Sequence, residues 1–367
     1  MIPVEIYTTV YYTALSIIIL LGIFPLFFKP NLESFPTINL TVTNLLLLTV
    51  TILFIGLRDP FGNWRYLGDT SHYTDIFFNY MDDPVYGIKS DYGFYLLMLF
   101  SKEYLNIYIF YILCSVLYVG PIYLLCKKYF KEYALFAFIL FVSSMSFWSF
   151  GINGVRNGLA TSVFLLGIYF YEKKWLMYVL ILISLSFHKS LVLSIIAFLL
   201  AMKFTNTLIL IRIWLALVFI SYAFGSQVET LVSNLLLNSG IIEDKRVDTY
   251  FSDEIDGAFM ERSYRLDFII YSGIAILLAY YYKYKKGFQD IFYDRIVNTY
   301  IIANTIWVFL IYAAYTNRIA YLSWFIMPFV LVYPLLKQKK LVRNQSLFLA
   351  LLILGSLTFT LLIYFKS

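Results

Sequence analysis

Long apolar runs separated by short polar corners repeat along almost the whole chain. The runs lack the alternation of apolar and polar residues that marks the strands of a membrane β-barrel. Many approach or exceed the ~20 residues that a helix needs to cross a bilayer. The pattern therefore predicts an all-α, polytopic membrane protein with about twelve spans. These spans lie at about 4–28, 39–57, 104–126, 133–150, 154–171, 174–187, 189–203, 207–225, 264–282, 296–315, 318–336 and 346–364.

Two polar stretches, at about 58–103 and 226–263, interrupt the series of spans. The second carries three basic and eight acidic residues. The first contains a short apolar piece, 92–100, that is under-length for a crossing and is expected to be re-entrant or to lie in the interface. Neither a repeat nor a soluble domain is visible. Residues 1–367 are therefore predicted to form a single multi-span membrane domain.

Basic residues predict the orientation of the spans. They cluster at Lys127-Lys128-Lys131, Lys173-Lys174, Lys283-Lys285-Lys286 and Lys337-Lys339-Lys340-Arg343. Threading the spans in order places every cluster on one side, which the positive-inside rule identifies as the cytoplasm. The two polar stretches then form outward-facing loops. Both termini also face outward, provided that 92–100 does not cross.

Composition fits a membrane protein and narrows the chemistry. The chain is 61% hydrophobic and only 14% charged, with a mean hydropathy of +0.77. Its two cysteines and two histidines show no metal-site spacing, so neither a metal nor a cofactor is expected. The first apolar run lacks a basic n-region and a cleavage site, which favours an uncleaved span. The net charge of +6 gives no indication of nucleic acid.

A predicted helical hairpin at the centre of the chain places two ionisable residues together. Two apolar arms meet at the corner Glu172-Lys173-Lys174. Arg156 lies 16 residues before Glu172, and His188 lies 16 residues after it. Because each helical residue rises about 1.5 Å, equal arms bring Arg156 and His188 to the same depth. That depth is the outer face, where ionisable groups at span ends indicate a functional site.

The predicted outer face collects further ionisable residues at or next to span ends. They are Arg58, Arg65, Asp69, His72, Asp75, Arg156, His188, Lys189 and Arg318. Several cations at this level favour an anionic ligand, because the planar guanidinium fork pairs two phosphate oxygens. The alternative is that these side chains snorkel to phospholipid headgroups.

Candidate roles follow from residue type. His188 is the natural general base, since an unperturbed imidazole titrates near pH ~6.5. Arg156 stands in a glycine-rich helix start beside Asn153 and Asn157, which is typical of a cavity lining or of close helix packing. Arg318 follows Asn317 at a similar outer span end. Asp69 is the runner-up base.

Four segments, in order, resemble the EpsG-like family of bacterial polysaccharide polymerases, which overlaps the Wzy-type O-antigen and capsule polymerases. They are GLRDPFGNWRYLGDTSHY, GVRNGLATSVFLLGIYFYEKK, ISLSFHKSL and TNRIAYL, between about Gly56 and Tyr321. The resemblance implies a GT-C-like glycosyltransferase of the bacterial cytoplasmic (inner) membrane, acting on the periplasmic or external face in the synthesis of lipopolysaccharide O-antigen or capsule.

The implied reaction is metal-independent and uses lipid-linked sugars. A glycan on undecaprenyl diphosphate is the donor, one lipid-linked repeat unit is the acceptor, and the anomeric configuration inverts. A chain-length regulator protein and membrane lipid are the implied partners. Arg156 and Arg318 are assigned to the diphosphate, with Arg58 and Arg65 as second candidates and Lys189 in support. Asp69 orients the sugar if it is not the base, and Trp64 and Tyr73 stack on sugars.

Two rival functions stay open at this point. An O-antigen ligase would share the arginines and the histidine but would need a different acceptor pocket. A transporter or flippase of lipid-linked oligosaccharide predicts charged residues near the bilayer midplane and a two-fold repeat. The ionisable groups lie instead at the predicted outer ends, and no repeat is visible, which favours the polymerase.

Overall fold

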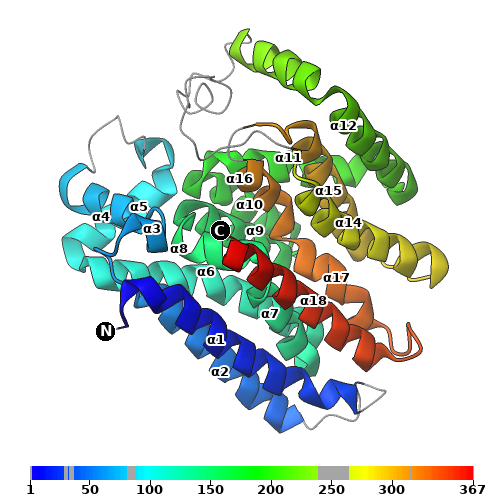
Figure 1. The fold of residues 1–367 in the computed structure, drawn as a ribbon, viewed down its shortest axis with the longest axis horizontal. Coiled ribbons are helices and arrows are strands. Elements are labelled where there is room, and N and C mark those ends of the chain that lie inside the picture. The colour runs from blue at the N-terminus through cyan, green and yellow to red at the C-terminus, as the bar shows by residue number, and fades with distance from the viewer. Residues whose placement is uncertain are drawn as a thin grey trace. The chain divides into compact units, whose positions relative to one another are not determined.

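The computed structural model describes residues 2–28, 32, 37–80, 88–238, 264–313 and 316–366. Across these ranges the chain is helical, and no β-strand occurs among them (Figure 1). The predicted all-α class is confirmed. The chain divides into two compact units. Unit 1 comprises Met1–Val192 and Val332–Ser367, and unit 2 comprises Leu193–Leu331.

Unit 1 begins with the helices of the amino-terminal half. They are α1 (Val4–Ile23), η1 (Phe24–Phe27), α2 (Thr37–Gly56), α3 (Trp64–Leu67), α4 (Thr70–Asp75), the π-helix η3 (Ile76–Tyr80), η5 (Ile88–Ser90), α5 (Tyr92–Tyr104), α6 (Ile107–Phe130), η6 (Lys131–Tyr133) and α7 (Ala134–Val142). It continues with α8 (Met145–Ile152), α9 (Val155–Tyr169), α10 (Lys174–Phe187), η7 (Lys189–Leu191) and, from the carboxyl end of the chain, α18 (Gln345–Lys366).

Unit 2 contains the helices of the second half. They are α11 (Val192–Lys203), α12 (Thr207–Asn238), α14 (Leu266–Tyr280), the π-helix η8 (Tyr281–Lys285), α15 (Ile291–Phe309) and α16 (Thr316–Trp324), and α17 (Met327–Lys337) runs from unit 2 into unit 1. A buried amide joins them. Asn304 Oδ1 accepts a hydrogen bond from Trp214 Nε1 at 2.8 Å, and Asn304 Nδ2 donates to the hydroxyls of Ser272 and Ser323 at 3.0 Å each. The polar centre of this unit is therefore satisfied within the protein.

Six helical segments of the described residues are long and apolar enough to cross a membrane. They are Val4–Phe27, Ile107–Val142, Thr207–Gly225, Leu266–Lys285, Thr316–Lys337 and Gln345–Phe365. The number of about twelve spans is not confirmed, because α9, α10 and α11 have 15, 14 and 12 residues, fewer than the ~20 of a full crossing. The chain is thus a helical membrane protein with several short apolar helices among its long ones.

The predicted span at 133–150 is divided by a serine pair. Helix α7 ends at Val142 and α8 begins at Met145, with Ser143 and Ser144 between them. The carbonyl oxygen of Ser143 accepts a hydrogen bond from Thr360 Oγ1 of α18 at 2.7 Å, and the Ser144 hydroxyl donates to Phe141 O at 2.7 Å. Side chains replace the helical hydrogen bonds that the break removes, which is what an apolar surrounding requires.

The polar stretches are more helical than the predicted loops. The stretch 58–103 contains α3, α4, η3, η5 and most of α5, and the apolar piece 92–100 lies within the 13-residue helix α5. Helix α12 continues to Asn238, past a non-helical residue at Phe224, so the stretch 226–263 begins inside a helix. Its remainder lies outside the described residues. That the stretches face outward, and that the whole chain forms one membrane domain, stay predictions.

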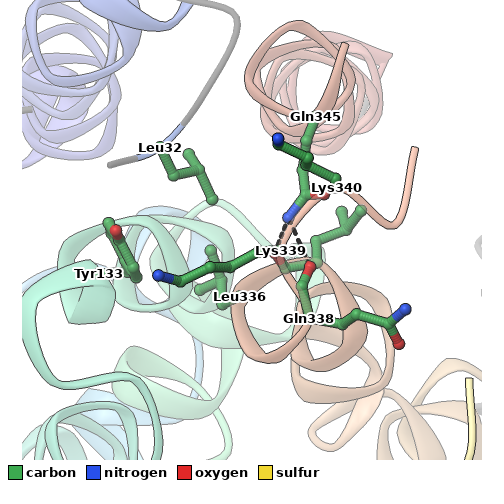
Figure 2. Close-up of a pocket in the computed structure, with 8 residues that line it drawn as sticks. Leu32, Tyr133, Leu336, Gln338, Lys339, Lys340 and Gln345 are labelled. Carbon is green, nitrogen blue, oxygen red and sulfur yellow. Dashed lines mark hydrogen bonds between the residues drawn. The ribbon is translucent and has the colours of Figure 1, made fainter. Parts of the chain in front are cut away.

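Three of the four basic clusters meet at one end of unit 1. Lys128 forms an ion pair with Glu172 at the corner of the α9–α10 hairpin, at 3.2 Å. The ammonium of Lys337, at the end of α17, lies 5.7 Å from the centre of the Tyr129 ring. The turn between α17 and α18 is at this end and borders a cavity (Figure 2). These three clusters therefore lie at one end of unit 1, as a common side requires, and the fourth cluster belongs to unit 2. That this end faces the cytoplasm stays a prediction.

Both described ends of the chain lie together in unit 1. Tyr7 Oη of α1 donates to Phe54 O near the end of α2 at 2.6 Å, and the hydroxyls of Thr9 and Tyr364 are 2.8 Å apart. Figure 1 shows α1 and α18, blue and red, beside each other. The start of α1, the end of α2 and the end of α18 therefore share one level, as the prediction of two termini on one side requires.

Glycine sets the distance between α9 and α8. A Cβ atom on Gly158 would lie 2.5 Å from the carbonyl oxygen of Phe150. Gly158→Ala is therefore expected to lower the free energy of unfolding by about 1–3 kcal/mol, because backbone must move to accept the methyl group. Thermal unfolding of the detergent-solubilised protein measures this.

Gly120→Ala is the matched control. It adds the same methyl group in α6, where nothing lies within 4 Å of the new atom. It should leave the melting temperature unchanged or raise it slightly, because alanine favours helix over glycine. Equal melting temperatures for Gly158→Ala and the wild type would contradict the close approach of the two helices.

Candidate functional site

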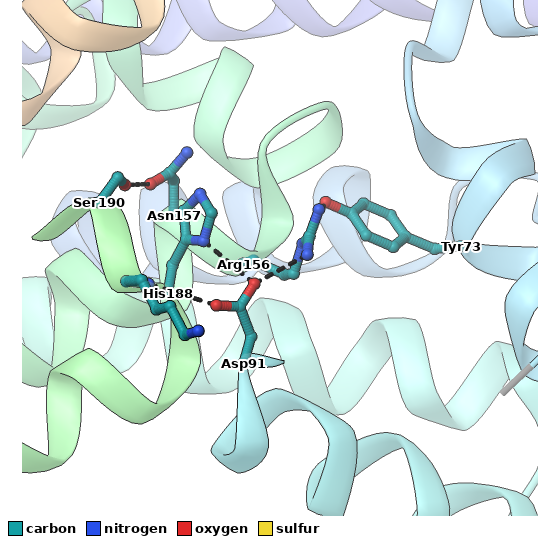
Figure 3. Close-up of polar contacts among 7 residues, drawn as sticks. Tyr73, Asp91, Arg156, Asn157, His188 and Ser190 are labelled. Carbon is teal, nitrogen blue, oxygen red and sulfur yellow. Dashed lines mark hydrogen bonds and ion pairs between the residues drawn. The ribbon is translucent and has the colours of Figure 1, made fainter. Parts of the chain in front are cut away.

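The centre of the candidate site is the carboxylate of Asp91. Its Oδ2 accepts a hydrogen bond from Arg156 Nη1 at 2.7 Å and lies 3.1 Å from His188 Nδ1 (Figure 3). Its Oδ1 accepts the backbone N–H of Lys189 at 3.2 Å. Only 1% of the Asp91 side chain is exposed, against 17% for Arg156 and 17% for His188. A buried carboxylate therefore joins the two residues that the predicted hairpin placed at one depth.

Helix ends bring these residues together. Asp91 is the N-cap residue of α5, yet its side chain makes no capping bond to α5 and points to the hairpin instead. Helix α10 ends at Phe187, and His188 is extended (φ −162°, ψ 124°). The short helix η7 begins at Lys189, whose backbone N–H faces Asp91. The partial positive charge of two helix starts adds to that of Arg156 in favouring the Asp91 anion.

A glycine allows α5 to approach α10 at this point. A Cβ atom on Gly93 would lie 2.3 Å from Ser186 Oγ. The same atom would lie 3.2 Å from the backbone carbonyl carbon of Ser186, so a side chain at this position would press on the α10 backbone as well as on the rotatable hydroxyl. Close backbone contact at small residues is the usual way in which membrane helices pack.

Tyr73 holds the other side of Arg156. Arg156 Nε donates to Tyr73 Oη at 3.4 Å, and the guanidinium carbon lies 5.7 Å from the centre of the same ring. Tyr73 is only 2% exposed. It therefore fixes the guanidinium from within the protein. Its predicted role in stacking on sugars stays a prediction, but the buried ring is poorly placed for it in this conformation.

The arrangement can perform acid–base chemistry. If the Nδ1 proton of His188 is donated to Asp91, Nε2 is the basic nitrogen of the neutral ring. A carboxylate in this position also stabilises the imidazolium that forms when His188 takes up a proton. Beside the ring, Ser190 Oγ donates to Asn157 Oδ1 at 2.9 Å, so predicted Asn157 borders the same place (Figure 3).

Asn153 has a different role from Asn157. Its Oδ1 accepts the backbone N–H of Asp69 at 2.9 Å. Gly68, with φ +56°, leaves the room for this contact, since a Cβ atom there would lie 2.5 Å from Asn153 Oδ1. Asn153 thus anchors the turn between α3 and α4 next to the site. Asp69, the predicted runner-up base, is placed by that turn, and its role as a base stays a prediction.

Arg58 is buried beneath the site and serves helix ends. Its side chain is 1% exposed, and Nη1 donates to Ile55 O at 3.1 Å and to Gly151 O at 2.6 Å, at the ends of α2 and α8. The guanidinium carbon lies 4.1 Å from the centre of the Tyr111 ring. Burial lowers the pKa of the guanidinium, because the charge is held out of water. The negative ends of two helix dipoles compensate this charge.

The remaining predicted residues have exposed or partly exposed side chains, and one of them belongs to unit 2. Arg65 and Trp64 belong to the short helix α3, where Trp64 is 73% exposed and Arg65 is also exposed. The Lys189 side chain is exposed, although its backbone N–H contacts Asp91. Arg318 is partly exposed on α16 of unit 2. The diphosphate and sugar roles given to these residues stay predictions.

Asp91 was not predicted from the sequence. It directly precedes the apolar piece 92–100 inside the first polar stretch, where acidic residues are usually solvated. The available signal was an aspartate directly before a helical apolar run, with a glycine two residues later, which is typical of an N-cap at a close packing point. No group of three or more histidine, cysteine, aspartate or glutamate residues that could hold a metal ion occurs in the described part of the chain.

Comparison with known proteins gives a single positive result. The family model described as "EpsG family" matches residues 42–367, which include Asp91, Arg156 and His188. No curated protein matches the chain, and no solved structure does. Because the family model covers most of the sequence, the chain belongs to the EpsG family.

Proposed function

We propose that this protein is a polysaccharide polymerase, a glycosyltransferase that joins lipid-linked repeat units of O-antigen or capsule on the outer face of the bacterial cytoplasmic membrane. The observation that carries the proposal is the histidine held by a buried carboxylate and flanked by an arginine. Membership of the EpsG family, a polysaccharide polymerase type of membrane protein, supports the reaction class.

The position of the site within unit 1 supports this reaction. Arg156 and His188 stand at the open ends of the α9–α10 hairpin, whereas Lys128 pairs with Glu172 at the closed end. Arms of about 15 residues separate the two ends by roughly 22 Å. With the basic end in the cytoplasm, as the positive-inside rule expects, His188 faces the outer headgroup level. That is the level of the diphosphate of an undecaprenyl-linked donor.

The proposed reaction is a single displacement. A hydroxyl oxygen of the acceptor repeat unit forms a bond to the anomeric carbon of the donor glycan. The bond from that carbon to the diphosphate oxygen breaks, and the lipid diphosphate leaves with the electron pair. His188 Nε2 takes the hydroxyl proton. Because one nucleophile displaces one leaving group, the anomeric configuration inverts.

Arg156 would have two functions in this scheme. Among the described residues, Nε and Nη1 are engaged by Tyr73 and Asp91. A guanidinium has five N–H groups, so three are left for diphosphate oxygens. Preorganised cations that meet developing negative charge stabilise the transition state electrostatically, without a metal ion. The exposed amine of Lys189 would add to this, since Asp91 neutralises part of the Arg156 charge.

Substitution of His188 tests the base. In a null strain complemented with His188→Ala, the surface-glycan ladder is expected to be absent, with single repeat units left on the carrier or core. General-base loss costs typically 10²–10⁴-fold in rate. His72→Ala is the comparison variant, because His72 is the second of the chain's two histidines. Its imidazole in α4 interacts electrostatically with Asp69 and Arg156, so a smaller loss is expected there than with His188→Ala. A normal ladder with His188→Ala at wild-type protein level would contradict the assignment.

Substitution of Asp91 separates stability from catalysis. Asp91→Asn leaves Arg156 without its counter-charge and is expected to lower the free energy of unfolding by about 3–5 kcal/mol. In Asp91→Asn with Arg156→Gln, both charges are removed, and the melting temperature should recover most of this loss. The double variant should still make no ladder, because His188 has lost its orienting carboxylate. A stable double variant that polymerises normally would show that Asp91 and Arg156 are only structural.

The glycan of the uncomplemented null strain tests the reaction class. Single repeat units on the carrier or core support a polymerase. Long chains stranded on the lipid carrier would replace the proposal by a ligase. Absence of surface glycan, with lipid-linked units accumulating on the inner leaflet, would replace it by a transporter.

A further inference from the structure

A second cavity lies at the basic end of unit 1, away from the hairpin ends that hold Arg156 and His188. Its volume is about 300 Å³, at the lower end of the range for small-molecule sites. It lies between the start of α18, the end of α17, η6 and Leu32 (Figure 2). It is lined by Leu32, Tyr133, Leu335, Leu336, Gln338, Lys339, Lys340 and Gln345. The proposed polymerase chemistry uses none of these residues.

The lining has the character of an amphiphile's site. Two lysine side chains and a tyrosine supply polar groups, and Figure 2 shows the Lys339 amine extending toward Tyr133 while Lys340 lies on the side of Gln345. Three leucines form an apolar wall against them. An anion with an attached apolar portion can contact both the polar side chains and the leucine wall, whereas a free inorganic anion can contact only the polar side chains.

Position in the fold gives the level of the cavity in a bilayer. The segments Thr316–Lys337 and Gln345–Phe365 are both long and apolar enough to cross a membrane. The turn that joins them, residues 338–344, is therefore at a membrane boundary, where phospholipid headgroups lie. Basic pockets between spans at such a boundary bind anionic headgroups.

Side-chain hydrogen bonds hold this turn in a defined conformation. The buried Gln345 side chain donates to Leu335 O and to Gln338 O, and its Oε1 accepts the backbone N–H of Leu341 at 2.8 Å. Lys340 has φ +57°, a left-handed conformation that is unfavourable for a residue with a side chain. Strained positions of this kind cluster at ligand sites, where the surrounding structure maintains them.

Charge at this end is predominantly positive. The clusters Lys127-Lys128-Lys131 and Lys337-Lys339-Lys340-Arg343 belong to it, against the exposed Glu132 of η6 and Glu172, which is paired with Lys128. The potential around the turn therefore attracts anions. We infer that the cavity binds the phosphate headgroup of an anionic phospholipid of the adjacent leaflet, with Lys339 and Lys340 on the phosphate and the leucines along the first acyl carbons.

Lipid binding to the purified full-length protein tests this inference. Phosphatidylglycerol titrated into the detergent-solubilised protein should raise its melting temperature, and native mass spectrometry should show retained lipid. Lys339→Gln with Lys340→Gln should weaken binding by about thirtyfold, as expected for two lysines near an anionic headgroup. Lys173→Gln with Lys174→Gln is the matched control, since it removes the same charge at the same end but lines no part of the cavity. Equal weakening in both variants would overturn the site.

Two further probes separate the sources of the signal. Phosphatidylcholine should give a much smaller shift than phosphatidylglycerol, and an equal shift would exclude recognition of the anion. Soluble glycerol phosphate should also raise the melting temperature only slightly. A shift as large as that with phosphatidylglycerol would show that the site binds a free phosphate and not a lipid. Lys340→Gly relieves the left-handed residue, so it should keep or raise the melting temperature without lipid while weakening phosphatidylglycerol binding. Unchanged binding in that variant would overturn the role of Lys340.

Discussion

The buried carboxylate of Asp91 is the interaction on which the candidate site depends. It is taken out of water, which is tolerable only because a guanidinium, an imidazole and a backbone N–H face its two oxygens. Each of those groups comes from a different helix end, so the carboxylate fixes the relative position of α5, α9 and η7. Removing this single negative charge would leave both Arg156 and the end of the hairpin without their common partner.

Small residues make that arrangement sterically possible. Gly93 permits the start of α5 to touch α10, Gly158 permits α9 to touch α8, and Gly68 permits the α3–α4 turn to reach Asn153. In a membrane, where lipid offers little hydrophobic drive for helix association, close backbone contact of this kind is a principal source of packing energy. The polar groups of the site are thus positioned by close helix contacts at glycines that lie a few residues away from them.

The sequence predicted those features that depend on interactions between residues close together in the chain. Hydrophobic runs predicted helices, and equal arms about Glu172 predicted that Arg156 and His188 would meet, because helical rise is regular. The break at Ser143 and Ser144 could not be predicted, since it depends on Thr360 from α18 supplying the missing hydrogen bond. The role of Asp91 was not predicted either, because it also depends on a contact with a distant part of the chain. An acid before a helix is usually a cap, and only tertiary contact reveals that it serves another helix. Arg58 was assigned to a ligand because its charge is visible in the sequence, whereas its burial at two helix ends is not.

The α9–α10 hairpin has a consequence for how this protein can change length. The lengths of its two arms set the positions of Arg156 and His188. Both side chains must reach the carboxylate of Asp91, so the two lengths have to match closely. Inserting one residue in either arm would turn its tip by about 100° and lift it by about 1.5 Å. Insertions of three or four residues nearly restore the angle but raise the tip by roughly one turn. Length variation is therefore excluded from both arms unless it is matched, and is most easily accommodated at the corner around Glu172.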